Sequence, residues 1–147
     1  MKSEPEAYSI RDLKNEEETL WDGIRNYQAR NFMRSMKIGD QAFFYHSNIK
    51  PPGIVGLMKI IDTKLIDPYQ FDKSSKYYDK KSHRDSPRWD CVKTKYICEF
   101  ENMITLKELT EAYTAEELTL VRKGNRLSIM PITKDIAMEL IKKLKKT

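Results

Sequence analysis

Residues 41–66, QAFFYHSNIKPPGIVGLMKIIDTKLI, carry the strongest β-strand signals of the chain. The run from Gln41 to Ser47 is mostly aromatic and apolar, and residues 53–66 are rich in isoleucine and other strand-forming residues. Aromatic and β-branched residues favour strands, whereas the Pro-Pro-Gly sequence between the two runs favours a turn. We therefore predict two strands that pair in antiparallel orientation.

Further along the chain, the sequence predicts a third strand followed by two short helices. Residues 91–104 alternate as a strand does. One helix is expected after Thr105, and another after Thr114, with Glu117 at the capping-box position and Gly124 at its end.

The two ends of the chain add a strand and three helices to this prediction. Residues 125–133 predict a last strand, and residues 134–146 predict a helix with one apolar face. Near the start, Ser9 is placed to cap a short helix over residues 10–13. Apolar side chains at three- and four-residue spacing predict another helix over residues 29–36.

The order of these elements predicts an α+β fold, with a small curved mixed sheet or barrel surrounded by short helices. A length of 147 residues favours a single domain over residues 1–147. No stretch approaches the roughly 18 to 20 apolar residues of a membrane helix, and no signal peptide is evident, so we expect no membrane partner. The expected location is cytoplasmic, or nuclear if the source is eukaryotic. Cys91 and Cys98 lie seven residues apart on one predicted strand, and they are expected to stay unpaired.

Positive charge is concentrated in one polar loop. The chain has 27 Lys and Arg against 22 Asp and Glu, a net charge of +5 that is compatible with a nucleic-acid partner without requiring one. Residues 67–90 form a long irregular segment, and long ordered loops are often functional. The stretch from Lys73 to Lys95 alone holds eight basic and three acidic residues. The candidate phosphate-binding side chains in it are Lys80, Lys81, Arg84 and Arg88.

Four motifs of common enzyme classes are absent from the sequence, which removes support for those classes without excluding an enzyme. It contains no phosphate-binding loop, dinucleotide fingerprint, nucleophile elbow or zincin motif. Two histidines and two cysteines lie far apart, so no metal site is expected. His46 and Ser47 are adjacent and would face opposite sides of a strand, which disfavours a nucleophile–base pair. A small nucleic-acid hydrolase using His46 or the acidic residue of the Tyr78-Asp79 pair is the enzymatic alternative.

Flat aromatic rings, amides and cations occur together in two places. Trp21, Asn26 and Gln28 fall within one short stretch, where an indole could stack on a base and amides could read its edge. Trp89 follows Arg88 and repeats the combination of ring and cation. Two indoles with amides could hold an unstacked base. The structural alternative is that Trp21 anchors the core and Asn26 caps a helix.

Residues 122–131, RKGNRLSIMP, place cations at a tight turn before the last predicted strand. Arg126 and its neighbours could bind phosphate, and an ordinary solvated hairpin is equally compatible with this spacing.

Six blocks together resemble the EVE domain family. They are MKSEP (1–5), WDGIRNYQARNFMR (21–34), GDQAFFYHSN (39–48), PGIVG (52–56), YYDKKS with SPRW (77–89), and RKGNRLSIMPIT (122–133). The resemblance implies a PUA-like fold, related to the YTH readers of methylated adenine in RNA. Family members commonly carry further residues before the first block, so a short first strand is expected here.

The resemblance also implies a site. It places a set of polar and aromatic residues around one opening, where the indoles would stack on a base and the serines and amide would bond its edge. These residues are Lys2, Ser3, Trp21, Asn26, Ser47, Trp89, Ser128 and Met130, with Arg126 beside them for phosphate.

The expected function is therefore non-catalytic binding of a modified nucleobase, with modified cytosine in DNA favoured and no cofactor required. A buried methyl group contributes only about 0.8 kcal/mol, so discrimination should depend on a closely fitting pocket. Modified tRNA or rRNA is the alternative partner. The chain is expected to act as a monomer, and the Lys-rich last helix could instead serve a protein partner, although a solvated face explains it as well.

Overall fold

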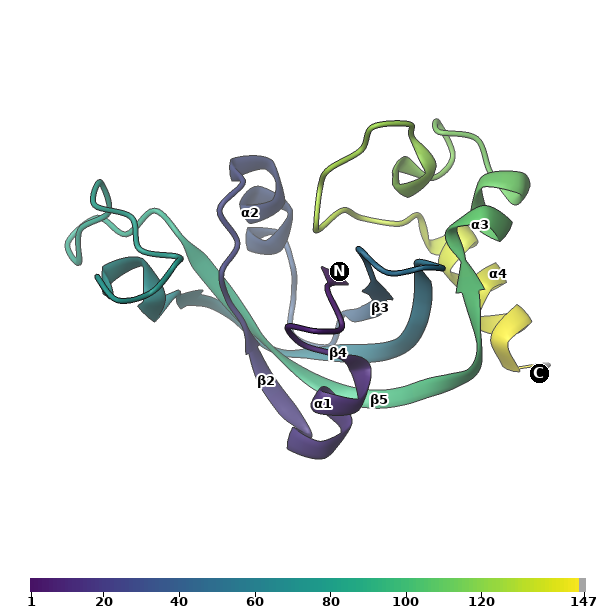
Figure 1. Ribbon diagram of the computed structural model, residues 1–147, viewed down its shortest axis with the longest axis horizontal. Coiled ribbons are helices and arrows are strands. Elements are labelled where there is room, and N and C mark those ends of the chain that lie inside the picture. The colour runs from purple at the N-terminus through teal and green to yellow at the C-terminus, as the bar shows by residue number, and fades with distance from the viewer. Residues whose placement is uncertain (146–147) are drawn as a thin grey trace.

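The computed structural model describes residues 1–145 and shows one open, mixed sheet of five strands (Figure 1). The strand order is β1-β3-β4-β5-β2. Only the β1–β3 pair is parallel, and the remaining neighbours are antiparallel. The strands are β1 (Lys2–Ser3), β2 (Glu18–Trp21), β3 (Gln41–His46), β4 (Gly53–Ile66) and β5 (Asp90–Thr105). The predicted α+β class, the antiparallel pair and the short first strand are confirmed.

The two long strands β4 and β5 give the sheet its curvature. Their pairing shifts register at four places, and Figure 1 shows β5 bending toward α3 at one end. Such irregularities increase local bend and twist. At Gly56 an added Cβ would lie 2.6 Å from the Cys98 carbonyl oxygen and 2.7 Å from Ile10 Cδ1. Glycine at this position therefore lets β5 and the first helix approach the β4 backbone.

Helices begin where the sequence supplies caps. They are α1 (Ile10–Glu16), α2 (Tyr27–Arg34), α3 (Leu106–Ala112) and α4 (Lys134–Lys145). Ser9 and Asp12 form a reciprocal capping box at α1, and Thr105 and Glu108 form one at α3. Each box satisfies two backbone N–H groups that would otherwise lack partners. The predicted starts of α1, α3 and α4 are confirmed, whereas α2 begins at Tyr27, two residues before the predicted range.

Two predicted elements are wrong, and two were missed, a strand and a short 3-10 helix (Pro68–Phe71) at the start of the basic loop (residues 67–90). Glu117 and Thr114 do form the capping hydrogen bonds, but the chain makes only a turn and a short 3-10 helix (Thr119–Val121). Leu118 instead adopts an extended conformation and is 1% exposed, so burial of this side chain ends the helical path. Residues 125–133 form no strand, although the Ser128 carbonyl accepts one hydrogen bond from Lys2 N. The four residues of β2 were not predicted.

Both faces of the sheet are covered by buried side chains. Alternation along β3 shows this directly, because Phe44 belongs to one core cluster while Phe43 and Tyr45 belong to the other. The first cluster packs α1, α2 and Trp21 against the sheet, and the second packs α3 and α4.

Residues 1–145 hold both cysteines and all the helices described above. Cys91 and Cys98 are both free thiols, as predicted. Within this described part of the chain, no helix combines the length and apolar character that a bilayer crossing requires.

Candidate functional site

A cleft of about 570 Å³ opens beside the parallel β1 strand, on the side where β2 ends. It is lined by residues 2–4, 7–8, 19–24, 76–77 and 128. Ligand sites for small molecules begin at about 300 Å³, so this space can accommodate a nucleobase. Four segments that are distant in sequence therefore meet at one opening.

The β1 strand is fixed on both sides by backbone hydrogen bonds. Lys2 N donates to the Ser128 carbonyl at 2.8 Å, and Ser47 N donates to the Ser3 carbonyl at 3.0 Å. The Ser3 hydroxyl donates to the Tyr8 carbonyl at 2.6 Å, which leaves its oxygen free to accept. Burial lowers the pKa of the Lys2 ammonium, whose Nζ lies 5.7 Å from the centre of the Tyr45 ring.

Trp21 forms part of the floor of the cleft and part of the core. Its side chain is 7% exposed, and its ring meets Phe44 edge to face with a centroid distance of 5.3 Å. Trp21 therefore anchors the core, as the structural alternative predicts, and it also lines the cleft, while stacking on a base stays a prediction. The ring position is fixed by the core before any ligand enters.

Tyr77 brings a second aromatic ring to the same cleft. The ring lies directly on Gly23, where an added Cβ would stand 2.8 Å from Tyr77 Cζ, and Gly23 has a φ of +77°. The sequence does not reveal this role of Tyr77, because its contact with Gly23 spans more than fifty residues of chain. The only available signal was the Tyr77-Tyr78 pair in the basic loop.

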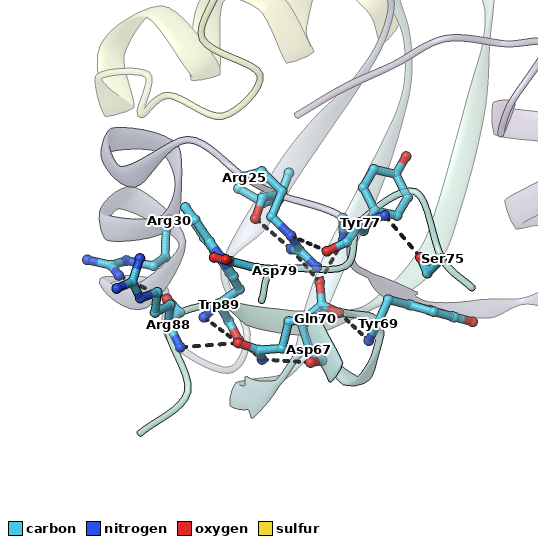
Figure 2. A network of polar contacts seen from close by, with 12 residues as sticks. Arg25, Arg30, Asp67, Tyr69, Gln70, Ser75, Tyr77, Asp79, Arg88 and Trp89 are labelled. Carbon is cyan, nitrogen blue, oxygen red and sulfur yellow. Dashed lines mark hydrogen bonds and ion pairs between the residues drawn. The ribbon is translucent and has the colours of Figure 1, made fainter. Parts of the chain in front are cut away.

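A buried amide organises the basic loop (Figure 2). The Gln70 side chain is fully buried, and its Nε2 donates to the Asp67 and Trp89 carbonyls at 2.7 Å each. Its Oε1 accepts from the Ser82 hydroxyl, from Arg88 N and from Trp89 N. One side chain thereby satisfies five polar groups and joins the two ends of the loop of residues 67–90.

An ion pair connects this loop to the cleft (Figure 2). Asp67 is fully buried, and Arg25 Nη1 donates to its Oδ2 at 2.9 Å. Arg25 Nε donates to the Tyr77 carbonyl at 2.9 Å, while Gly23 N donates to Asp67 Oδ2 at 2.8 Å. These contacts hold Tyr77 and Gly23 in one geometry.

Trp89 lies in the loop and does not line the cleft. Its side chain is 4% exposed, and one ring face stacks on Tyr27 at a centroid distance of 4.8 Å. Its Nε1 donates to Asp79 Oδ2 at 2.8 Å, and this hydrogen bond is the main reason that the pKa of Asp79 is lowered. The structure thus does not bring Trp21 and Trp89 to one opening, and Trp89 anchors the loop.

Three other predicted base-binding residues also lie outside the cleft. Asn26 caps α2, where its Oδ1 accepts from Ala29 N at 2.9 Å. Ser47 contacts the cleft only through its backbone bond to β1. Met130 lines a separate apolar cavity of about 580 Å³ beside α2, β3 and α4. Of the predicted set, the structure gathers Lys2, Ser3, Trp21 and Ser128.

The predicted phosphate-binding residues remain available for charge interactions. Lys80, Lys81, Arg84 and Arg126 are exposed, and Arg88 is half-buried with its Nη1 3.3 Å from the Tyr27 hydroxyl. Among the described residues, none of these five cations forms a salt bridge. Lys76, another cation of the basic loop, lines the cleft itself.

His46 has a structural contact that conflicts with a role as a general base. Its Nε2 accepts a hydrogen bond from Ile10 N at 3.1 Å, at the first residue of α1. Burial lowers the pKa of His46, and the nearby Glu99 partly opposes this change. Over residues 1–145, no group of three or more His, Cys, Asp or Glu side chains is arranged to hold a metal ion.

Comparison with known proteins identifies the family. The EVE domain model matches residues 1–143. Human thymocyte nuclear protein 1 is 43% identical over 153 residues, covering 92% of this chain and 68% of the human protein. A crystal structure of a Pseudomonas syringae protein shares 42% identity with a TM-score of 0.92, covering 97% of this chain and 95% of that one.

A further similar structure is that of the human THYN1 protein in complex with DNA containing 5-methylcytosine. It shares 41% identity with a TM-score of 0.91, and covers all of this chain and 96% of that one. Both the family model and the similar structures match this chain over nearly its whole length. The chain belongs to the EVE domain family and has its PUA-like fold.

Proposed function

We propose that this chain is a non-catalytic DNA-binding domain that receives a modified cytosine in the cleft beside β1. The observation that carries the proposal is the meeting of Trp21, Tyr77 and Ser128 at one opening of suitable size. The complex of the human THYN1 protein with 5-methylcytosine DNA supports the choice of ligand.

The proposed binding mode divides recognition between rings and polar groups. Tyr77 stacks on the base, because every base offers an aromatic face and such stacking is worth about 1–3 kcal/mol. The Ser128 hydroxyl has no hydrogen-bond partner within the described residues and is free to bond the base edge. Lys80, Lys81 and Arg84 hold the backbone phosphates of the same strand. The domain acts as a monomer in this mode, because one cleft suffices.

The test compares otherwise identical oligonucleotides that carry 5-methylcytosine or cytosine at one position. We expect tighter binding of the methylated strand, and a loss of about tenfold in its affinity in Tyr77→Ala. Tyr78→Ala is the matched control, because Tyr78 is exposed, adjacent and outside the cleft. Equal weak binding to both strands, unchanged in Tyr77→Ala, would overturn the proposal. An RNA strand of the same sequence tests the alternative partner.

A further inference from the structure

Asp22 lines the cleft directly after Trp21, at the point where β2 ends. Its side chain is half-buried, and its carboxylate is bonded only to its own backbone N–H among the described residues. Most partly buried carboxylates are satisfied by neighbours, because desolvation of an unpaired charge is costly. Asp22 therefore offers unused acceptor capacity inside a cleft.

The surroundings of Asp22 favour a ligand that donates hydrogen bonds. Burial raises the pKa of Asp22, the nearby Asp67 raises it further, and Arg25 opposes both effects. Arg25 acts on Asp22 through its charge alone: its hydrogen bonds go to Asp67 and to the Tyr77 and Ile24 carbonyls, and none reaches Asp22. A hydrogen-bond donor entering the cleft would offset the desolvation cost of the Asp22 carboxylate, which no side chain within residues 1–145 offsets by a hydrogen bond.

The proposed ligand must also be distinguished from thymine. Thymine carries the same C5 methyl group as 5-methylcytosine, so a contact with the methyl group cannot separate the two bases. They differ at position 4, where cytosine presents an amino donor and thymine presents a carbonyl acceptor. Discrimination therefore needs an acceptor in the protein, and carboxylates are the usual acceptors for the cytosine amino group.

We propose that Asp22 accepts a hydrogen bond from the 4-amino group of the bound cytosine and thereby excludes thymine. This inference rests on the proposed function and adds the residue that selects the base. Thymine would place its carbonyl oxygen against the carboxylate, so two acceptors would face each other without a proton between them. Sites built around a specific hydrogen bond reject analogues that cannot form it.

The test measures binding of single-stranded oligonucleotides that differ only in one base, 5-methylcytosine or thymine. Single strands remove the unequal cost of extracting each base from a duplex. We expect the wild-type protein to prefer 5-methylcytosine by about tenfold or more. In Asp22→Asn the preference should fall to within about threefold, because the amide can turn either its oxygen or its NH₂ toward position 4.

Glu6→Gln provides the matched control. Glu6 is an exposed carboxylate outside the cleft lining, and its replacement changes the net charge by the same amount. The preference should persist in this variant. Thermal unfolding checks that Asp22→Asn folds.

The possible failures are distinguishable. Equal wild-type binding of 5-methylcytosine and thymine, both tighter than cytosine, would overturn the role of Asp22 and leave the proposed function standing. Retention of the full preference in Asp22→Asn would do the same. Equal weak binding of 5-methylcytosine, thymine and cytosine would overturn the proposed function and this inference together.

Discussion

At the scale of single residues, the uncharged Gln70 side chain holds the basic loop together through five hydrogen bonds. Its side-chain amide bonds four backbone groups and one hydroxyl, so its removal leaves several buried groups unpaired. These groups are the Asp67 and Trp89 carbonyls, the Arg88 and Trp89 N–H groups and the Ser82 hydroxyl. Each unsatisfied group costs about 1–3 kcal/mol. We expect Gln70→Ala to lower the free energy of unfolding by about 3 kcal/mol or more.

Urea denaturation measures this loss. Gln28→Ala serves as the control, because Gln28 is exposed on α2 and its replacement should change stability by less than about 0.5 kcal/mol. A loss below about 1 kcal/mol in Gln70→Ala would show that water replaces the amide and that the loop does not depend on it.

The residues of the cleft show how far the sequence could predict the site. The cluster of indole and amides predicts Trp21, the family blocks predict both Trp21 and Ser128, and both residues line the cleft. Trp89 has the same combination of ring and neighbouring cation, but in the structure it stacks on Tyr27 and donates to Asp79. The local sequence does not reveal these two contacts. Asp22 stood beside Trp21 and was not selected, because its distinguishing feature is the lack of a partner in three dimensions.

At the scale of elements, local signals predicted helix starts better than helix lengths. The boxes at Ser9 and Thr105 are followed by helices, whereas the equally regular box at Thr114 is followed by a single turn. The difference arises from tertiary packing, since Leu118 and Leu120 are both buried in the second core cluster. Capping residues determine where a helix can begin, and burial determines whether it continues.

The turn after β2 provides a prediction at this scale. Gly23 has a φ of +77° and supports the Tyr77 ring, so Gly23→Ala combines backbone strain with a collision against Tyr77 Cζ at 2.8 Å. We expect the collision to displace Tyr77, reducing affinity for the 5-methylcytosine strand by about fivefold or more. The variant should also lose about 1–3 kcal/mol of stability.

Gly124→Ala is the control that separates the two effects. Gly124 also has a φ of +77°, but nothing lies within 4 Å of an added Cβ. This variant should carry the backbone strain alone and keep its affinity in a binding titration. If both variants bound equally well, Tyr77 would not be held in place by its contact with Gly23.

At the scale of the whole molecule, charge is distributed unevenly along the long axis. The stretch from Lys73 to Lys95 accounts for the entire net charge of +5, which leaves the rest of the chain electrically neutral. Within this stretch, residues 73–89 of the loop hold six basic and two acidic side chains, while Lys93 and Lys95 lie on β5. Figure 1 shows the loop at one end of the molecule and α4 at the other. A nucleic acid that enters the cleft would therefore meet most of its favourable charge on the loop side.

This distribution predicts how salt affects binding. Each phosphate contact releases counterions, so replacing Lys80 and Lys81 by Gln should reduce the slope of log affinity against log salt by about 1.4 on a single strand. The preference for 5-methylcytosine over cytosine should remain, because phosphate contacts carry no base information. Titrations over a series of salt concentrations measure both quantities. The control replaces Lys107 and Lys142, two exposed lysines of α3 and α4, and should leave the slope unchanged. Equal slopes in the two double variants would mean that net charge alone attracts the strand, and that the loop ordered by Gln70 does not bind it.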